Sequence, residues 1–397
     1  MLSVLLIHSE VYLMERTKIQ QVFDFKYEEC SKKHHLSYEQ KKAASSISLC
    51  KSGKFGFNVS ICDECGYVKV HNNSCRNRNC PNCQAVKKEL WVDKRRSEVI
   101  DAPYFHAVFT LPDKLNTLIY SNQKQLYSLM HSCSSKTILE LASNPKHLGA
   151  TPGIIQVLHT WGQKLNYHPH IHCVISGGGL TRDKKLKISG KSFFIPVKAM
   201  GKLFKGKFLA ELKAMYLENK LTIPASCSEL ENPILWREFL NSLYSCDWCP
   251  YIKETFNGFG NAIDYLGRYT HRIAISNSRI KQVDSESVTF SAKDYRTGET
   301  HDVTLSNVEF IRRFLMHVLP SGFMKVRYYG LLSNRFKKKN LQLIFNLQNK
   351  RQFRSQFQGL STPEILKKVW NYDIYRCPCC GKSSMKPLGK NYHYQIE

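Results

Sequence analysis

The sequence predicts an α+β fold with a central antiparallel sheet that carries helices on one face and follows a helical and zinc-ribbon segment. Runs of aromatic and β-branched residues, which are typical of strands, occur at 104–111, 154–160 and 170–176. Between them, apolar residues recur at helical spacing from 115 to 141. Two C-x2-C pairs precede the first of these strands. This order of parts favours helices segregated against an antiparallel sheet.

The composition indicates a polyanionic partner. The 397 residues include 58 lysines and arginines against 32 acidic residues, which gives a net charge of +26. Nucleic acid is the simplest partner for such a chain, and a charge that serves solubility or a membrane surface is the alternative. We see no secretory signal and no apolar run of membrane-spanning length, so we expect a cytoplasmic, nucleoid-associated protein. We therefore interpret the fifteen cysteines as free thiols and metal ligands and not as a disulfide framework.

The N-terminal part, 1 to about 55, looks helical, and Ser37 with Gln40 fits a capping box at a helix start. A dense cysteine cluster follows, with two C-x2-C pairs at zinc-ribbon spacing. We expect a closed structural zinc site without a catalytic position, and Cys75 is a fifth cysteine that either replaces one ligand or is simply buried. The predicted ligands are Cys62, Cys65, Cys80 and Cys83.

Basic residues surround this cysteine cluster, among them Arg76 and Arg78. A zinc-stapled basic module suggests DNA docking. The alternative is a solvated, charged helix that follows the ribbon.

The strand at 170–176 carries the motif His170-Ile171-His172 and is followed by three glycines, which suggest a turn. Residues two apart on a strand point to the same face, so the two imidazoles would stand side by side as half of a divalent-metal site. The alternative is a strand with two partly buried, hydrogen-bonded histidines.

Residues 181–250 look like a helical insertion. Beyond it, Tyr265 and Tyr269 lie four residues apart, one above the other if the segment is a helix. Two ordinary core tyrosines are the alternative for this pair taken alone. Short strands are expected at 273–276, 288–292 and 303–306, followed by a helix at 308–318.

Two further C-x2-C pairs have no local partner. They are Cys246 with Cys249, and Cys377 with Cys380 near the end of a basic C-terminal segment. The second pair is half of a zinc site that could borrow the first pair, close between subunits or stay empty, and the sequence leaves these alternatives open.

The order of these motifs resembles that of the HUH single-strand endonucleases: a strand ending in F-T-L-P, a strand with His-hydrophobic-His, and a Tyr-x3-Tyr helix. The more detailed resemblance is to rolling-circle insertion-sequence transposases of the two-tyrosine type with an N-terminal zinc-binding domain. It extends from about residue 20 to the C-terminal cysteines and is most specific at 74–84, 159–180 and 265–277. Asn79 is a departure, because relatives often have histidine there.

The resemblance implies an HUH nuclease core and assigns roles to individual residues. His170 and His172 would hold a catalytic Mg²⁺ or Mn²⁺, with Gln163 or Asp264 as the candidate third ligand. Tyr265 and Tyr269 would attack single-stranded DNA and form a 5′-phosphotyrosine link whose energy is retained for rejoining. The candidate DNA-contacting residues are Arg76, Arg78, Arg268 and Arg272.

The expected domains are a helical and zinc-ribbon DNA-binding unit at 1–100, an HUH tyrosine nuclease at 101–330 with a helical insertion at about 181–250, and a basic C-terminal segment at 331–397. The alternatives are a zinc-ribbon DNA-binding regulator without catalysis, a plasmid replication initiator or relaxase, and a histidine-triad nucleotide hydrolase, which the alternating histidines 168, 170 and 172 suggest.

Overall fold

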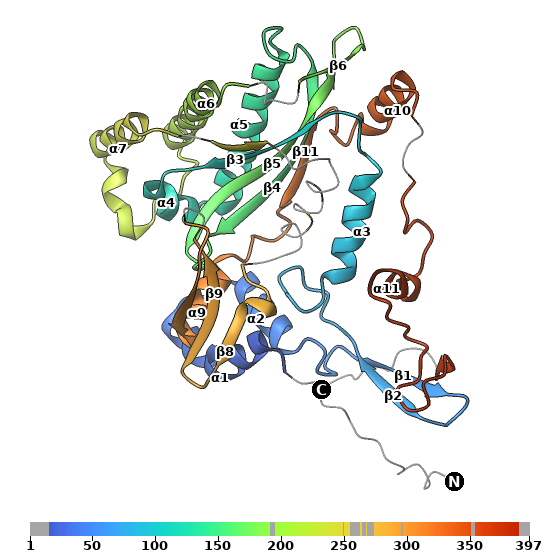
Figure 1. The fold of residues 1–397 in the computed structure, drawn as a ribbon. Coiled ribbons are helices and arrows are strands. Elements are labelled where there is room, and N and C mark those ends of the chain that lie inside the picture. The colour runs from blue at the N-terminus through green and yellow to red at the C-terminus, as the bar shows by residue number, and fades with distance from the viewer. Residues whose placement is uncertain are drawn as a thin grey trace.

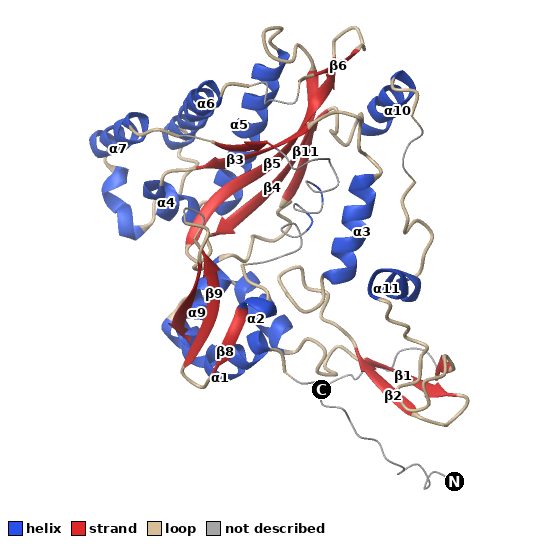
Figure 2. Cartoon of the chain, viewed as in Figure 1, coloured by secondary structure: helices blue, strands red, loops and turns tan. Residues whose placement is uncertain are grey.

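The protein combines helices with antiparallel sheets, as predicted (Figures 1 and 2). Of the helices in the described part of the chain, none combines the length and apolar character that a membrane span requires. The computed structural model describes residues 16–190, 195–248, 250–254, 263, 267, 274–294, 297–350 and 354–388.

The largest sheet has the strand order β11-β4-β5-β3-β7, with β6 paired to β5, and its pairings are antiparallel. The three strands expected at 104–111, 154–160 and 170–176 are confirmed as β3, β4 and β5, and β5 lies between the other two. The bounds are β3 Tyr104–Thr110, β4 Thr151–Trp161, β5 Tyr167–Leu180, β6 Leu186–Ile188, β7 Tyr251–Glu254 and β11 Val326–Gly330.

The three glycines that the sequence suggested as a turn lie inside β5, which continues to Leu180. These glycines allow neighbouring chain segments to pass close to the backbone of β5. A Cβ on Gly179 would lie 2.4 Å from the carbonyl oxygen of Thr151 on β4, and one on Gly178 would lie 2.9 Å from Cβ of Ala102. Only glycine therefore lets the strand pass here without displacing its neighbours.

One face of this sheet packs against four helices and forms the largest apolar core. Phe109, Ile154 and Ile171 are fully buried in it with residues of α5 and α6. Figure 1 shows these helices stacked beside β3, β4 and β5. The bounds are α4 Asn116–Ser121, α5 Gln123–Ser143, α6 Val197–Leu217 and α7 Pro233–Ser245.

The second face of the sheet is covered as well. Ile155, Val157 and Val174 are buried there with side chains of α3 (Ala85–Arg96) and α10 (Lys337–Leu347). The prediction of helices on one face is therefore incomplete. Strands β4 and β5 carry apolar side chains on both faces of the sheet, so helices must cover both faces to keep these side chains from water.

A second packed unit joins the start of the chain to residues 274–318. Helices α1 (Lys18–Lys33) and α2 (Tyr38–Ser48) pack against α9 (Asn307–Met316) and share a buried cluster with the β8–β10 sheet. The capping box is confirmed, because Ser37 Oγ accepts from the Gln40 N–H at 3.3 Å and Gln40 Oε1 accepts from the Ser37 N–H at 2.8 Å.

The strands of that small sheet are β8 Ile280–Val283, β9 Ser287–Lys293 and β10 Thr300–Ser306. They confirm the strands expected near 288–292 and 303–306, and α9 confirms the following helix. Residues 274–276 are not in a strand, contrary to prediction, and residue 273 lies outside the described residues.

A third sheet has the order β12-β1-β2 and joins the two ends of the chain, with bounds β1 Phe57–Cys62, β2 Val68–Asn72 and β12 Met385–Pro387. Helix α11 (Thr362–Trp370) precedes β12 and packs on α3. The carboxylate of Asp93 on α3 accepts hydrogen bonds from the Gln356 and Phe357 N–H groups at 3.0 and 3.2 Å. Short 3-10 turns lie at Asp113–Leu115, Ala225–Glu231 and Asn277–Arg279.

Candidate metal centres

Three histidines from two neighbouring strands meet on the second face of the central sheet. His159 comes from β4, His170 and His172 come from β5, and a ring nitrogen of each lies within 4.8 Å of the others. The antiparallel register sets His159 directly opposite His170. The alternation of strand side chains therefore brings the predicted pair together and adds a third imidazole.

Neighbouring groups orient two of these rings. His170 Nδ1 donates to the backbone carbonyl of His168 at 2.6 Å, and His172 Nδ1 lies 2.8 Å from Nε2 of His106 on β3. The rings of His106 and His172 are stacked, with their planes 8° apart. Both contacts engage Nδ1, so Nε2 is the nitrogen that each ring offers to a metal.

Burial keeps these imidazoles neutral. It lowers the pKa of His170 to about 3 and holds the pKa values of His159 and His172 well below the ordinary range. A neutral imidazole is the form that binds metal. Three imidazoles without a carboxylate suit a transition metal better than a hard cation, so of the two metals expected from sequence the set fits Mn²⁺ better than Mg²⁺.

A lysine adjoins the histidine cluster. Lys325 precedes β11, and its carbonyl accepts from the Leu158 N–H at 3.0 Å. Its Nζ lies 4.8 Å from the centre of the Trp161 ring. Burial lowers the pKa of Lys325 to about 7, and the positive charge of Lys325 contributes to the low pKa of His159 and His172. Sequence reasoning missed both Lys325 and His159.

Gln163, one of the two candidate third ligands named from sequence, is not in this cluster. Gln163 lies in the turn after β4, where its carbonyl accepts from Arg279 Nη2 at 2.7 Å and its side-chain oxygen accepts from the Lys293 N–H at 3.5 Å. Asp264 lies outside the described residues. His159 could have been identified from its position on β4, because that strand pairs with the strand of His170 and His172 and the side chain of His159 points to the same face.

Tyr265 and Tyr269, together with Arg268 and Arg272, also lie outside the described residues. Two residues of the same stretch are described. Ile263 and Gly267 are helical and buried, and Ile263 belongs to the apolar cluster of the second face. A Cβ on Gly267 would lie 2.2 Å from Cγ2 of Val92 on α3, so Gly267 packs directly against that helix.

The cysteines form two clusters among the described residues, which corrects the predicted single zinc site. Cys80 and Cys83 join Cys50 and Cys75, whereas Cys62 and Cys65 join Cys377 and Cys380. The hairpin of β1 and β2 carries the first C-x2-C pair away from the second. Cys75 is thus a member of a cluster, and Cys50 was missed because no second cysteine accompanies it in sequence.

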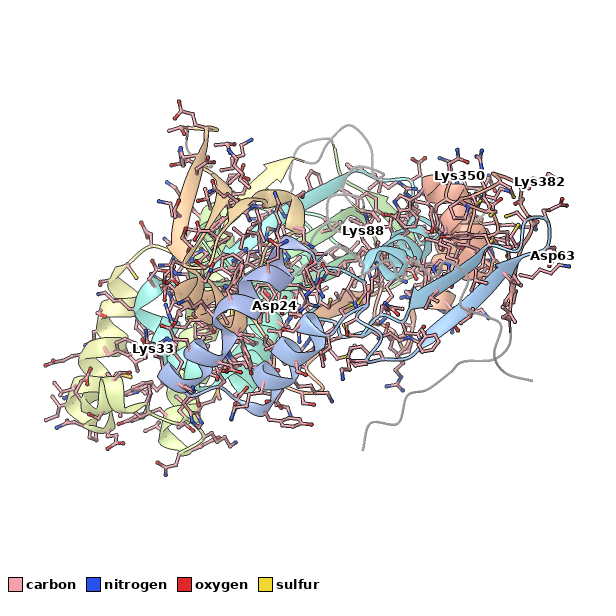
Figure 3. The ribbon with its side chains drawn as sticks, turned by 90° about the horizontal axis from the view of Figure 1, so that it is seen from below. Asp24, Lys33, Asp63, Lys88, Lys350 and Lys382 are labelled. Carbon is pink, nitrogen blue, oxygen red and sulfur yellow. The ribbon has the colours of Figure 1, made fainter. Side chains whose placement is uncertain are left out.

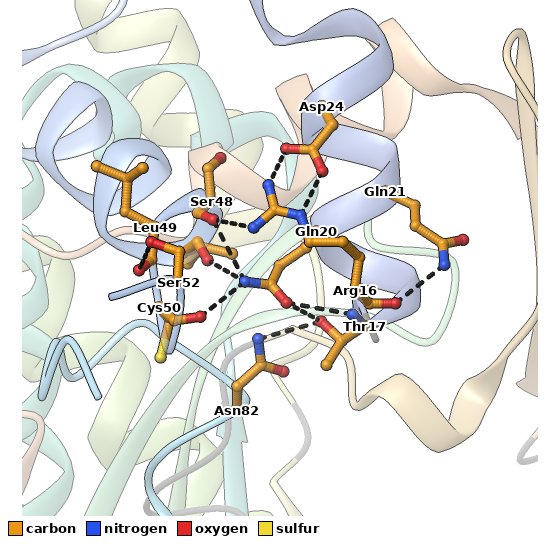
Figure 4. Close-up of polar contacts among 11 residues, drawn as sticks. Arg16, Thr17, Gln20, Gln21, Asp24, Ser48, Leu49, Cys50, Ser52 and Asn82 are labelled. Carbon is orange, nitrogen blue, oxygen red and sulfur yellow. Dashed lines mark hydrogen bonds and ion pairs between the residues drawn. The ribbon is translucent and has the colours of Figure 1, made fainter. Parts of the chain in front are cut away.

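Helix α1 anchors the cluster of Cys50, Cys75, Cys80 and Cys83 through contacts of Cys50 and Asn82, which Figure 4 shows. Gln20 Nε2 donates to the carbonyl of Cys50 at 3.0 Å, and Asn82, within the C-x2-C loop, donates to Thr17 Oγ1 at 3.1 Å. The sulfurs of Cys75 and Cys83 are 3.7 Å apart. A tetrahedral zinc with Zn–S bonds near 2.3 Å requires sulfurs about 3.8 Å apart, so the thiols present fit structural zinc.

Arg76 and Arg78, the two arginines of this region that were expected to contact DNA, differ in the contacts that their side chains make within the protein. Arg76 is exposed, with a positive φ of 52°. Arg78 is also exposed, but its guanidinium donates to the backbone carbonyls of Phe323 at 2.7 Å and Pro320 at 2.9 Å. Arg78 therefore ties the cysteine region to the loop before β11.

Cys246 belongs to no metal-binding group among the described residues. The thiol of Cys246 donates to the carbonyl of Leu243 at 3.3 Å. Cys249 lies outside the described residues.

Comparison with known proteins gives a consistent assignment. A family model described as "Putative transposase" matches residues 153–340, and one described as "Transposase zinc-binding domain" matches residues 22–111. The first match includes the three histidines, and the second includes the cluster of Cys50, Cys75, Cys80 and Cys83.

Two relatives match over most of their length. The "Putative transposase y4qJ" of Sinorhizobium fredii is 37% identical over 375 residues, which cover 91% of this chain and 92% of the relative. The "Transposase for insertion sequence element IS801" of Pseudomonas savastanoi pv. phaseolicola is 29% identical over 344 residues, covering 86% and 81%. No solved structure matches the chain. From the identity over nearly its whole length and the two matching family models, the chain belongs to the insertion-sequence transposases that carry a zinc-binding domain.

Proposed function

We propose that this transposase cleaves and rejoins single-stranded DNA by metal-assisted tyrosine transesterification, in the manner of the two-tyrosine HUH enzymes. The observation that carries the proposal is the cluster of His159, His170 and His172 on the second face of the sheet. Ile263 and Gly267 are buried against the α3 side of the same face. In the sequence Tyr265 stands between these two residues, two positions from each.

In this proposal the three imidazoles would hold a divalent ion, preferably Mn²⁺. Such an ion would supply charge withdrawal from the scissile phosphate, which favours in-line attack. The oxygen of Tyr265 or Tyr269 attacks phosphorus, the bond from phosphorus to the 3′-oxygen breaks, and the departing oxygen takes up a proton. The products are a 5′-phosphotyrosine link and a free 3′-hydroxyl.

Rejoining reverses the same step. A 3′-hydroxyl attacks the phosphotyrosine, and the tyrosine leaves with the proton, so strand transfer requires no nucleotide triphosphate. Two tyrosines allow one strand end to stay attached while a second is cut. Lys325 adjoins the histidines, and in its protonated form it would stabilise the charge that develops on the phosphate.

The segments outside the nuclease have distinct roles in this proposal. The cysteine-rich part of 1–100 would bind the ends of the element, with exposed Arg76 among the contacts. Residues 101–330 would form the nuclease, with α6 and α7 in the insertion, and 331–397 a basic accessory segment. The net charge of +26 supports binding along a DNA backbone.

The test is a covalent adduct assay on labelled single-stranded DNA that covers the ends of the element. With Mn²⁺ we expect a protein–DNA band on a denaturing gel that disappears in the Tyr265→Phe/Tyr269→Phe variant. Tyr251→Phe, on the exposed edge of β7, is the matched control and should retain the band. Tight DNA binding without an adduct, under any metal, would contradict the proposal and favour a DNA-binding regulator.

A further inference from the structure

The pairing of the N-terminal cysteines with those near the C-terminus has no counterpart in the zinc-binding domain match, which ends at residue 111. The sulfurs of Cys62 and Cys380 lie 3.6 Å apart, as do those of Cys65 and Cys377. All four lie within 4.8 Å of one another. These separations are too long for disulfides, whose sulfurs are about 2.05 Å apart, and close to the roughly 3.8 Å of a zinc tetrathiolate.

The two half-sites have the same backbone structure. Gly66 N–H donates to the Cys62 carbonyl at 2.9 Å, and Gly381 N–H donates to the Cys377 carbonyl at 3.0 Å. The glycines have φ values of 72° and 74°, a left-handed conformation that glycine adopts without strain. Each C-x2-C-G loop is therefore a knuckle that turns both of its sulfurs inward.

The first cysteine of each pair, Cys62 or Cys377, also makes the same backbone hydrogen bond through its N–H group. Cys62 N–H donates to the carbonyl of Tyr67 at 2.9 Å, and Cys377 N–H donates to that of Lys382 at 2.7 Å. Two knuckles of one geometry, facing each other, form a preorganised four-sulfur cage.

Contacts outside the cysteines support the same arrangement. Strand β12 pairs with β1, with Met385 opposite Cys62, and Lys382 pairs with Glu64 at 2.6 Å. Ser384 Oγ lies 3.0 Å from Cys62 Sγ, where its hydroxyl can donate to a thiolate. Figure 3 shows Asp63 and Lys382 at the same end of the molecule.

We infer that the chain binds a second structural zinc ion through Cys62, Cys65, Cys377 and Cys380, and that this ion closes the chain between its N-terminal ribbon and its C-terminal segment. The ligands are separated by 312 and 318 residues. Binding free energy at such a site also stabilises the fold that assembles it, so the ion holds the β12 segment on the ribbon. Residues 354–388 would thereby be fixed at two points, on α3 through Asp93 and on β1 through the zinc.

The experiment is a measurement of zinc per chain on the full-length protein by mass spectrometry of the metal. We expect two zinc ions in the wild type and one in Cys377→Ser/Cys380→Ser. Cys62→Ser/Cys65→Ser should also bind one, and the quadruple variant should still bind one, because both pairs serve a single site. Cys379→Ser is the matched control, since Cys379 is exposed and outside the cluster, and it should retain two.

A further variant distinguishes the loss of a zinc ligand from misfolding of the chain. Cys380→His retains a zinc ligand at an exposed position and should keep two ions, while its cobalt-substituted form shows weaker thiolate charge-transfer absorption. Retention of two zinc ions by Cys377→Ser/Cys380→Ser would overturn the inference. A single ion in the wild type that is lost from Cys80→Ser/Cys83→Ser would do the same. Neither readout involves DNA cleavage, so this test and that of the proposed function fail independently.

Discussion

The two faces of the central sheet come from the same strands and are both packed with apolar residues, but the second face also carries the histidine cluster. Toward α5 and α6, β3 and β5 present Phe109 and Ile171, which are fully buried among apolar side chains. Toward α3, the same strands present His106, His170 and His172. A one-residue shift of register would exchange the faces, so the packing of the apolar face sets the position of the histidines.

The largest expected effect tests the histidine face. We expect His172→Ala to lower the rate of adduct formation by about 10³-fold or more, because the proposed metal loses a ligand at the reacting phosphate. The rate is measured with labelled single-stranded DNA under excess Mn²⁺. His301→Ala, on exposed β10, is the control and should leave the rate unchanged. Equal rates in wild type and His172→Ala would remove the distinction between the faces.

The corresponding change on the apolar face acts on stability. Phe109 is fully buried, and its ring centre is 4.9 Å from that of Phe204 on α6. Phe109→Ala should reduce the free energy of unfolding by about 3–5 kcal/mol through lost burial and a residual cavity. Denaturant titration measures this loss. Wild-type stability in this variant would mean that α6 does not depend on the sheet for its packing.

A smaller effect is expected at His106, which contacts His172 without belonging to the three-histidine cluster. His106→Ala should weaken the affinity for Mn²⁺ by about 10–100-fold, because the Nδ1 partner that orients His172 is lost. If His106 only positions His172, saturating Mn²⁺ should bring the cleavage rate of His106→Ala close to that of the wild type. A loss that saturating metal does not restore would instead make His106 a direct participant.

The smallest effect concerns the histidine on the apolar side. His131 of α5 is fully buried, hydrogen-bonded to the Gln156 side chain at 2.9 Å, and burial lowers its pKa to about 3. The unfolded chain takes up a proton near pH 6.5 and the folded chain does not, so stability falls as pH drops from about 6.5 toward 3.

The slope for this one group approaches 1.4 kcal/mol per pH unit below pH 6. Urea unfolding of wild type and His131→Gln between pH 7 and pH 5 should show the wild type losing more stability on acidification. Parallel pH profiles of the two proteins would show that His131 is not kept neutral by the fold.

Local patterns in the sequence predicted the local features well. Runs of aromatic and β-branched residues identified β3, β4 and β5, and Ser37 with Gln40 identified the start of α2. H-x-H identified two members of the histidine cluster. His159 could not be placed in the same way, because its approach to His170 depends on which residues of two strands stand opposite each other.

The cysteines show the limit of spacing arguments more clearly. Two C-x2-C pairs with fourteen residues between them favour one ribbon, yet each pair has a different partner. Cys50 lies just after α2 and Cys377 lies 312 residues from Cys65, so no local pattern connects either to its cluster. Only the β1–β12 pairing and the packing of α1 on the Cys80 loop bring them together.

The facing knuckles also bear on how the protein is made. Cys62 and Cys65 leave the ribosome more than 300 residues before Cys377 and Cys380. At translation rates of 5–20 residues per second, that interval is roughly 15–60 s. During this time the ribbon holds only half of its cage, and a chain that terminates early never completes it. Strand β12 would thus act as a late check on synthesis, because only a chain translated beyond Cys380 can close the site.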